Sequence, residues 1–164
     1  MSEMLNTTFG LVPPEVAATL SGLDLLQGLL DGTYPAPPFA ETTDLWPISV
    51  ETGKVVFEAR PSKRFYNPMG FVHGGWISLL IDTVMGCAVQ STLKAGQTYT
   101  TLEMKTTFVR SVLETTGNLR CEGIMLHSGS RTASAEGKIF DGSGRLVAHG
   151  SETCLVMDAL KKAS

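Results

Sequence analysis

The first third of this 164-residue sequence contains no lysine and no arginine. Residues 1–53 hold seven acidic residues, whereas the rest of the chain holds all 13 basic residues against nine acidic ones. A secretory signal needs a positively charged start and a transit peptide needs arginines, so neither is expected. The net positive charge of residues 54–164 is compatible with binding of a small polyanionic ligand. An ordinary random distribution of charged residues explains this charge equally well.

Cysteine is also scarce, and its spacing argues against both disulfides and metal. Cys87, Cys121 and Cys154 are odd in number, widely separated and set in apolar segments. They resemble buried thiols of a reducing compartment. Because no Cys-x-x-Cys or His-Glu-x-x-His pair occurs, the sequence predicts a cytoplasmic protein without a metal or other cofactor.

Several motifs of common functional classes are missing. The sequence has no Gly-x-Ser-x-Gly elbow of a serine hydrolase and no glycine-rich phosphate-binding loop. It has no basic face interleaved with aromatic residues, so nucleic acid is not an expected partner. These absences leave a small-molecule enzyme or binding protein.

The sequence has no long, purely apolar run either. Its longest segment that is nearly free of charge contains a single carboxylate. Between Phe71 and Leu93, Asp82 is the one charged residue apart from any charge on His73. The stretch is too polar and too interrupted by glycine to span a membrane, so it predicts a buried helix. Burying an unpaired carboxylate costs several kcal/mol, and such groups often have functional roles.

Periodicity and turn residues predict one α+β domain over residues 1–164, with residues 1–40 as a helical leader and connector. One long helix packed against a curved antiparallel sheet is the simplest arrangement of these elements. In chain order we expect a helix from Pro13 or Pro14 to Gly32, an extended connector through Pro35, Pro37 and Pro38, strands 45–51 and 54–60, a helix from about Gly75 to Leu93, and strands 97–110, 117–127, 131–141 and 145–157.

The turn His73-Gly74-Gly75 precedes the long helix and can act as an anion site. Glycine lets a ligand approach the backbone closely, and the first N–H groups of a helix lack intrahelical partners. Such a terminus can stabilise an oxyanion, although flexible turns also use Gly-Gly. Asp82 can be a structural carboxylate, or it can act as a nucleophile or general base in acyl transfer.

The spacing between these two features constrains how they can cooperate. Gly74 and Asp82 are eight residues apart, which corresponds to about 12 Å along one helix. One carbonyl cannot touch both groups of the same chain. If both act on one carbonyl, they come from two chains related by a two-fold axis, so this hypothesis predicts a homodimer.

Other polar residues near the motif have a functional and a structural interpretation. Asn67 precedes Pro68 and is typical of a turn, but its amide can also hydrogen-bond a carbonyl or orient water. His73 can act as a base or orient the loop. We interpret His127 and His149 as structural.

The pattern Asn67-(x)5-His73-Gly74-Gly75-(x)6-Asp82 resembles the signature of hotdog-fold acyl-CoA thioesterases. The similarity is greatest to the phenylacetic acid degradation type, which is related to the 4-hydroxybenzoyl-CoA thioesterases. It covers about residues 20–157, including the leader 22–26 and the segment 106–110. The resemblance implies a hotdog fold, in which an antiparallel sheet wraps around one helix.

The resemblance also implies roles for individual residues. Asp82 would attack the thioester carbonyl or activate water, and the Gly74 N–H of the other subunit would polarise that carbonyl. Asn67 would assist, and His73 would support the loop and the carbonyl. Thr101 resembles the position of a hydroxyl that holds the hydrolytic water, with Thr100 as its oppositely facing neighbour.

Three further residues resemble positions that bind the CoA moiety of the substrate: Arg110, Ser130 and Arg131. The implied partners are an acyl-CoA and further copies of the chain, as a homodimer or, by family analogy, a dimer of dimers. The implied activity is hydrolysis of an acyl-CoA to free acid and CoA. The alternatives are a hotdog hydroxyacyl dehydratase or hydratase, and a non-catalytic acyl-CoA-binding protein.

Overall fold

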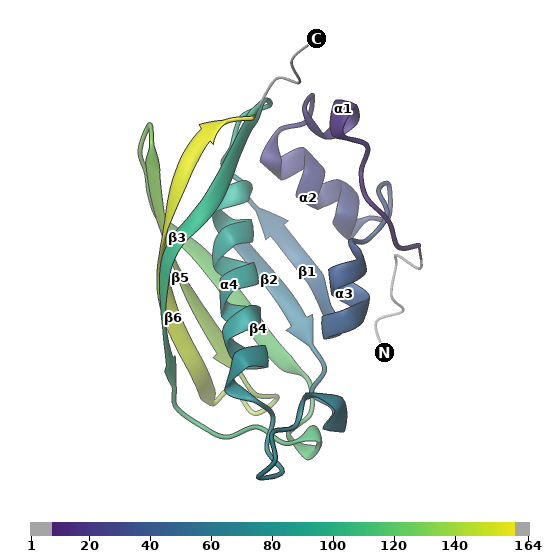
Figure 1. Ribbon diagram of the computed structural model, residues 1–164, viewed down its shortest axis with the longest axis vertical. Coiled ribbons are helices and arrows are strands. Elements are labelled where there is room, and N and C mark those ends of the chain that lie inside the picture. The colour runs from purple at the N-terminus through teal and green to yellow at the C-terminus, as the bar shows by residue number, and fades with distance from the viewer. Residues whose placement is uncertain (1–7, 160–164) are drawn as a thin grey trace.

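The computed structural model describes residues 8–159, in which a curved antiparallel sheet wraps around one long helix, α4 (Figure 1). The sheet has six strands in this part of the chain, in the spatial order β1-β2-β4-β5-β6-β3. The strands are β1 Leu45–Glu51, β2 Lys54–Ala59, β3 Gln97–Phe108, β4 Leu119–Ser128, β5 Thr132–Phe140 and β6 Leu146–Asp158. This is the α+β hotdog arrangement that the sequence and the resemblance predict.

Helix α4 spans Gly74–Gln90 and is apolar on most of its circumference, because the sheet curves around it. The close approach needs glycine on the sheet: a Cβ at Gly123 of β4 would collide with the backbone carbonyl of Val84. The end of the helix is fixed by Ser91, whose hydroxyl donates to the carbonyl of Ala88 at 2.7 Å and accepts from the Gly53 N–H at 2.8 Å. The helix is therefore held at a fixed height against the sheet.

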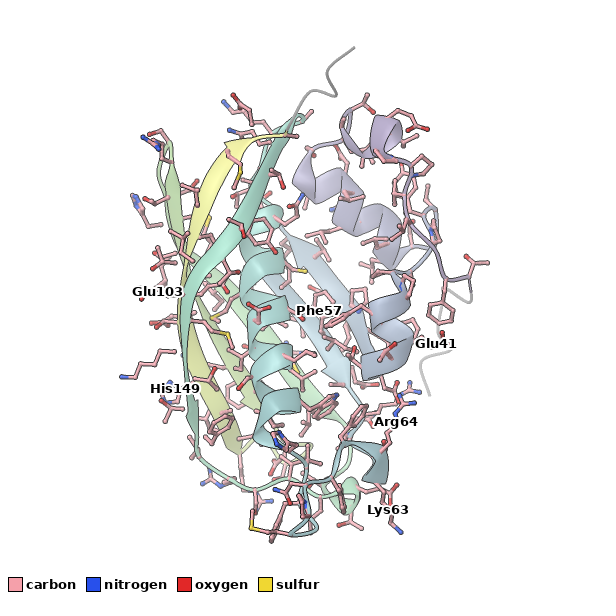
Figure 2. The ribbon with its side chains drawn as sticks, in the orientation of Figure 1. Glu41, Phe57, Lys63, Arg64, Glu103 and His149 are labelled. Atoms are coloured by element: carbon pink, nitrogen blue, oxygen red, sulfur yellow. The ribbon has the colours of Figure 1, made fainter. Side chains whose placement is uncertain are left out.

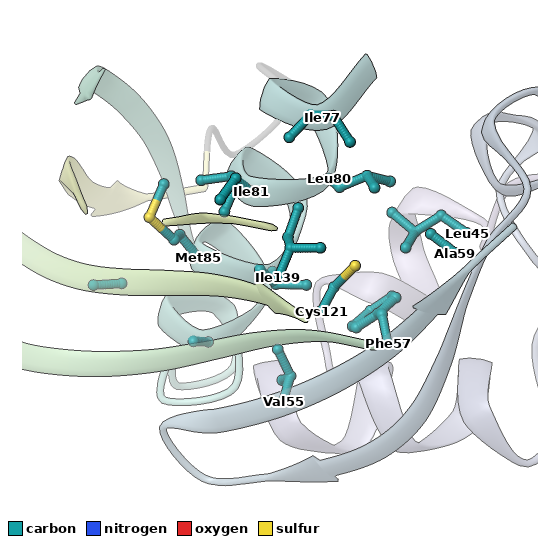
Figure 3. Packing of buried hydrophobic residues seen from close by; sticks show 14 of the residues in the cluster. Leu45, Val55, Phe57, Ala59, Ile77, Leu80, Ile81, Met85, Cys121 and Ile139 are labelled. Carbon is teal, nitrogen blue, oxygen red and sulfur yellow. The ribbon is translucent and has the colours of Figure 1, made fainter. Parts of the chain in front are cut away.

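The core lies between α4 and the inner face of the sheet (Figure 3). Ile81 and Met85 point from the helix toward β5, where Ile139 is fully buried. Along β5 the inward residues alternate with polar outward ones, which confirms the prediction of a sheet with one covered face. Fully buried side chains of the core include Val55, Leu80, Ile81, Val84, Met85, Leu119 and Ile139.

The N-terminal leader packs over β1 and the end of α4 (Figure 1), and it differs from the predicted single helix. It forms α1 Pro14–Ala17 and α2 Gly22–Leu30, interrupted at Ser21. The Ser21 hydroxyl accepts a hydrogen bond from the Asp24 N–H at 3.1 Å and so caps the N-terminus of α2.

The predicted extended connector was wrong at its end, because a third helix, α3, occupies Pro38–Thr43. Pro38 is its first residue, a position where proline is favoured because that N–H would be unpaired anyway. Trp76 of α4 donates its indole N–H to the Thr43 carbonyl at 3.0 Å, which fixes the end of α3 against α4. The predicted strand 45–51 is confirmed, and the other predicted elements begin and end within three residues of the expected positions.

Two short 3-10 turns, Lys63–Phe65 and Glu114–Thr116, flank the start of α4. Within residues 8–159 no helix is long and apolar enough to cross a membrane.

Candidate active site

The loop before α4 is built around the side chain of Asn67. Its Oδ1 accepts from the N–H groups of Met69 at 2.9 Å and Phe71 at 3.2 Å, as expected of an Asn that organises a turn. The Asn67 N–H donates to the Phe71 carbonyl at 2.7 Å. The carbonyl oxygen of the Asn67 amide is thus used by the loop, whereas its two amide N–H donors have no partner among residues 8–159.

His73 is the N-cap of α4, and its ring organises the helix start. Its Nδ1 accepts from the Gly75 N–H at 2.8 Å, and its own N–H donates to the Phe65 carbonyl at 2.7 Å. In the described part of the chain nothing accepts a hydrogen bond from the Gly74 N–H. The helix therefore presents one free, dipole-aligned N–H at Gly74.

Asp82 lies midway along α4 and is half-buried, less deeply than the apolar stretch predicts. Partial burial raises the pKa of its carboxyl, and a side-chain hydrogen bond from Thr101 opposes that shift. The cost of desolvating this carboxylate is therefore partly offset by one hydroxyl donor.

Thr101 comes from the edge strand β3, at a point where the strand is irregular. It is paired with Cys154 of β6, and the register then shifts between Thr101 and Glu103, as in a β-bulge. Bulges re-aim side chains and are common near active sites. Thr100 is exposed, so of the two neighbouring threonines the structure brings Thr101 to Asp82.

Gly74 and Asp82 lie at different heights of the same helix. A Cβ on Gly74 would be 3.2 Å from the ring of Phe108, at the end of β3, whereas Asp82 is level with Thr101. Asp82 follows Gly74 by eight residues, which corresponds to about 12 Å along the helix axis. A single chain does not bring these two groups onto one carbonyl.

The three residues expected to hold CoA also do not gather within one chain. The Arg110 N–H donates to the Val147 carbonyl near the start of β6, and the guanidinium of Arg110 donates to the Leu146 carbonyl. Arg131, next to Ser130, accepts through its carbonyl from the Val156 N–H, nine residues further along β6. At about 3.4 Å per residue these positions are about 30 Å apart.

The remaining histidines lie outside this constellation. His127 and His149 are both exposed, and His149 projects from the outer side of the sheet, away from α4 (Figure 2). Among the residues that the structure describes, no group of three or more His, Cys, Asp or Glu side chains could hold a metal ion. The three cysteines are free thiols, two of them buried and Cys87 partly so.

Sequence reasoning missed one acidic residue beside the site, Glu152 of β6. It is only 3% exposed, so it is more deeply buried than Asp82. Its Oε1 accepts a hydrogen bond from the Cys154 thiol at 3.1 Å, whereas its Oε2 has no partner in the part of the chain that the structure describes. The strand alternation contained the signal, since Glu152 takes an inward position between Gly150 and Cys154.

A family model now connects this geometry with known proteins. The model of the thioesterase superfamily matches residues 69–148, which include the turn before α4, Asp82 and Thr101. A conserved protein of Pseudomonas aeruginosa is 30% identical, and the superposition covers 73% of this chain and 94% of that one with a TM-score of 0.68. The chain belongs to the thioesterase superfamily.

Other solved structures place this thioesterase superfamily member among hotdog proteins. A phenylacetic acid degradation-related protein of Ralstonia eutropha JMP134 is 27% identical, with coverage of 79% of this chain and 97% of that one and a TM-score of 0.72. A Streptococcus mutans UA159 protein bound to acetyl-CoA is also 27% identical, with 70% and 90% coverage and a TM-score of 0.63. No curated protein matches the chain. Membership supports thioester hydrolysis as the general activity.

Proposed function

We propose that the protein is an acyl-CoA thioesterase whose active site combines Asp82 of one subunit with Gly74 of another. The observation that carries the proposal is the half-buried Asp82 carboxylate, held by Thr101, on a helix whose first N–H, at Gly74, has no partner among the described residues. The bound acetyl-CoA of the Streptococcus mutans protein supports a CoA thioester as substrate. A cytoplasmic location is part of the same proposal.

The chemistry assigned to these groups is attack on the thioester carbonyl. In one route Asp82 takes a proton from water while the water oxygen bonds to the carbonyl carbon. In the other, the carboxylate itself adds and forms a mixed anhydride that water then hydrolyses. In both, negative charge moves from Asp82 to the carbonyl oxygen, the C–S bond breaks, and the CoA thiolate leaves and is protonated.

The Gly74 N–H is the oxyanion donor in this proposal. It points along the helix axis at the positive end of the dipole, where developing charge is stabilised. The Asn67 amide supplies a second donor, since its N–H groups are not used by the loop that its oxygen organises. His73 acts indirectly, by fixing the helix start through the Gly75 N–H.

In this proposal the second subunit pairs with the first through the edge strand β3. Because Asp82 is level with Thr101 and Gly74 lies about 12 Å from it toward the Phe108 end of β3, an antiparallel pair of β3 strands would need Thr101 opposite a partner residue three or four positions further along β3. That pairing puts the two-fold axis midway between these two positions. It continues the sheet across both chains and brings Asp82 to the height of the partner's Gly74.

The exposure of β3 supports such a pairing. Met104 and Phe108 are opposite the buried Glu152 and Ala148 of β6, yet they are 40% and 55% exposed. Leu102 is 58% exposed on the same strand. A twelve-residue edge strand with exposed apolar side chains is a template for pairing, and the chain's own helix leaves it uncovered.

Two subunits also offer a way to assemble the CoA contacts. Arg110 lies at one end of β3, and Ser130 and Arg131 lie near the other end. An antiparallel pair of β3 strands brings the Arg110 end of one chain to the Arg131 end of its partner. We therefore assign the CoA phosphates to Arg110 of one subunit and Ser130 and Arg131 of the other. A dimer of such dimers would repeat this site.

For the acyl group we propose the apolar cavity between the leader and α4. It has a volume of about 100 Å³, and Thr83 and Cys87 of α4 are part of its wall. Cys87 lies close enough to Asp82 for the Asp82 charge to contribute to the raised pKa of the thiol, after burial and Glu152. Since a dry cavity of about 150 Å³ holds benzene, this smaller one suits a short aliphatic acyl chain.

Release of free CoA thiol from a series of acyl-CoAs tests the proposal. We expect hydrolysis of short aliphatic acyl-CoAs at a higher kcat/KM than of phenylacetyl-CoA, and loss of turnover in Asp82→Asn. Preference for phenylacetyl-CoA would overturn the assignment of the acyl cavity. Absence of turnover across the series, with binding retained, would overturn hydrolysis and favour a binding protein.

A further inference from the structure

Glu152 is the most deeply buried ionisable carboxyl near the site, and the mechanism above does not use it. It lies on the inner face of β6, and no described residue forms a hydrogen bond with its Oε2. A buried carboxyl with one oxygen that lacks a hydrogen-bond partner destabilises the fold, so its presence needs an explanation. Its neighbours suggest what it does.

A chain of hydrogen-bonding side chains connects Glu152 with Asp82. The Cys154 thiol donates to Oε1 of Glu152 at 3.1 Å. Burial and Glu152 raise the pKa of this thiol, and hydrogen bonding from the Thr101 side chain lowers it. The Thr101 hydroxyl in turn donates to Asp82. Thr101 and Cys154 are directly paired across β3 and β6, so the strand register holds the middle of this chain.

We propose that Glu152 is a positioning residue for Asp82: through Cys154 and Thr101 it orients the hydroxyl that holds the carboxylate, and its charge sets how strongly that carboxylate acts as a base. This inference rests on the proposed function of Asp82. It concerns the same reaction but assigns a second carboxyl that does not touch the substrate.

The direction of the thiol proton follows from the state of Glu152. When Glu152 is protonated, its O–H can donate to the Cys154 sulfur, which leaves the thiol proton for the Thr101 oxygen. Every donor then points toward Asp82. When Glu152 is ionised, the thiol donates to it instead, and Thr101 becomes a weaker donor to Asp82.

Two effects therefore act together when Glu152 ionises. Asp82 loses part of its hydrogen-bond stabilisation, and a second negative charge repels it. In the reaction, charge leaves Asp82 for the carbonyl oxygen, so both effects favour the transition state over the ground state. Ionised Glu152 makes Asp82 more reactive.

The ionisation falls in the physiological range. Burial raises the pKa of Glu152 to about 7, with the Cys154 hydrogen bond opposing the shift and the Asp82 charge adding to it. The other ionisable neighbours stay neutral there, because burial raises the pKa of Cys87 and of Cys154 to about 12 and also raises the pKa of Tyr99 above its ordinary value. The inward residues of β5 are Ala133, Ala135, Gly137 and Ile139, none of which titrates.

The first test follows the carboxyl groups of the ligand-free protein by carbon NMR during a pH titration. We expect a step near pH 7 that is absent from Glu152→Gln, and that moves to lower pH in Asp82→Asn because the neighbouring charge is removed. Glu136→Gln is the matched control, since Glu136 is exposed on β5 and should leave the step unchanged. No step near pH 7, or a step unmoved by Asp82→Asn, would overturn the coupling.

The second test compares kcat/KM between pH 6 and 8. The natural protein and Glu136→Gln should show a rise of about three- to tenfold through pH 7, and Glu152→Gln should be flat over this range. Superimposable profiles would overturn the positioning role even if the protein cleaves thioesters. If no thioester is cleaved, the positioning role falls with the proposed function, and the carboxyl titration shows whether the coupled pair still exists.

Discussion

The side chain of Thr101, on edge strand β3, is hydrogen-bonded to the carboxylate of Asp82 in the middle of helix α4. This hydroxyl lowers the pKa of Asp82 against the raising effect of burial. In Thr101→Val the pKa of Asp82 should rise further, so the acidic limb of the pH–rate profile should move to higher pH. The hydroxyl also fixes the direction in which the carboxylate points, and a misplaced carboxylate no longer reaches the carbonyl carbon. We therefore expect kcat to fall about tenfold or more even though the carboxylate becomes more basic.

Thr100→Val is the matched control for this prediction, because Thr100 is the next residue on β3 and is exposed. It should leave both the acidic limb and kcat close to those of the natural protein. Equal effects of the two substitutions would show that Thr101 acts through the strand and not through Asp82.

The free N–H of Gly74 can be tested by removing the hydrogen without removing the helix. Gly74 is the first residue of α4, and His73 before it has an extended conformation with φ −64° and ψ 135°. Both features tolerate proline at position 74. Gly74→Pro should lower kcat by about 100- to 1,000-fold, the usual effect of losing an oxyanion donor.

Gly74→Ala controls for the added carbon atoms, since it keeps the N–H and also meets the ring of Phe108, 3.2 Å from the new Cβ. Its kcat should lie well above that of Gly74→Pro. If alanine is as damaging as proline, packing against Phe108 is what matters and the N–H is not the donor.

Burial of Glu152 has a consequence for stability that does not depend on activity. Its pKa is about 7 in the folded protein against an ordinary 4.5. The unfolded chain therefore releases this proton first, and the free energy of unfolding should decrease as pH rises from about 4.5 to about 7. One pKa unit corresponds to about 1.4 kcal/mol, so with solvent screening the decrease should be on the order of 2 kcal/mol.

Denaturant unfolding at pH 5 and pH 8, at one protein concentration, measures this difference. Glu152→Gln should lose less stability between the two pH values than the natural protein does, and Glu136→Gln should behave like the natural protein. Identical losses in all three proteins would mean that Glu152 titrates normally.

The sequence predicted the long helix and the sheet because both have clear periodicity and glycine-rich turns. The prediction from sequence was wrong in the leader. The leucines keep their helical spacing on both sides of Ser21, so this spacing does not indicate the interruption of the helix there. The Ser21 cap on Asp24 was a readable signal. It also failed at α3, because the prolines near Pro38 were interpreted as breaks, although proline at a first helical position starts a helix.

The candidate site was partly predictable for a similar reason. Asp82 stands out because its neighbours in sequence are apolar. Glu152 does not, since it follows Ser151 in an ordinary alternating strand, and its burial depends on α4 and β3 packing over that position. The connection from Asp82 through Thr101 and Cys154 depends on the pairing of β3 with β6, which local sequence does not specify.

In the proposed mechanism, one active site needs Asp82 from one chain and Gly74 from another. Co-expression of Asp82→Asn and Gly74→Pro chains carrying different tags tests it directly. Each variant alone should be nearly inactive, whereas random pairing makes half of the dimers mixed, each with one intact site, so about a quarter of the natural activity should return. If the purified mixed dimer is no more active than either variant alone, the site is not shared between subunits.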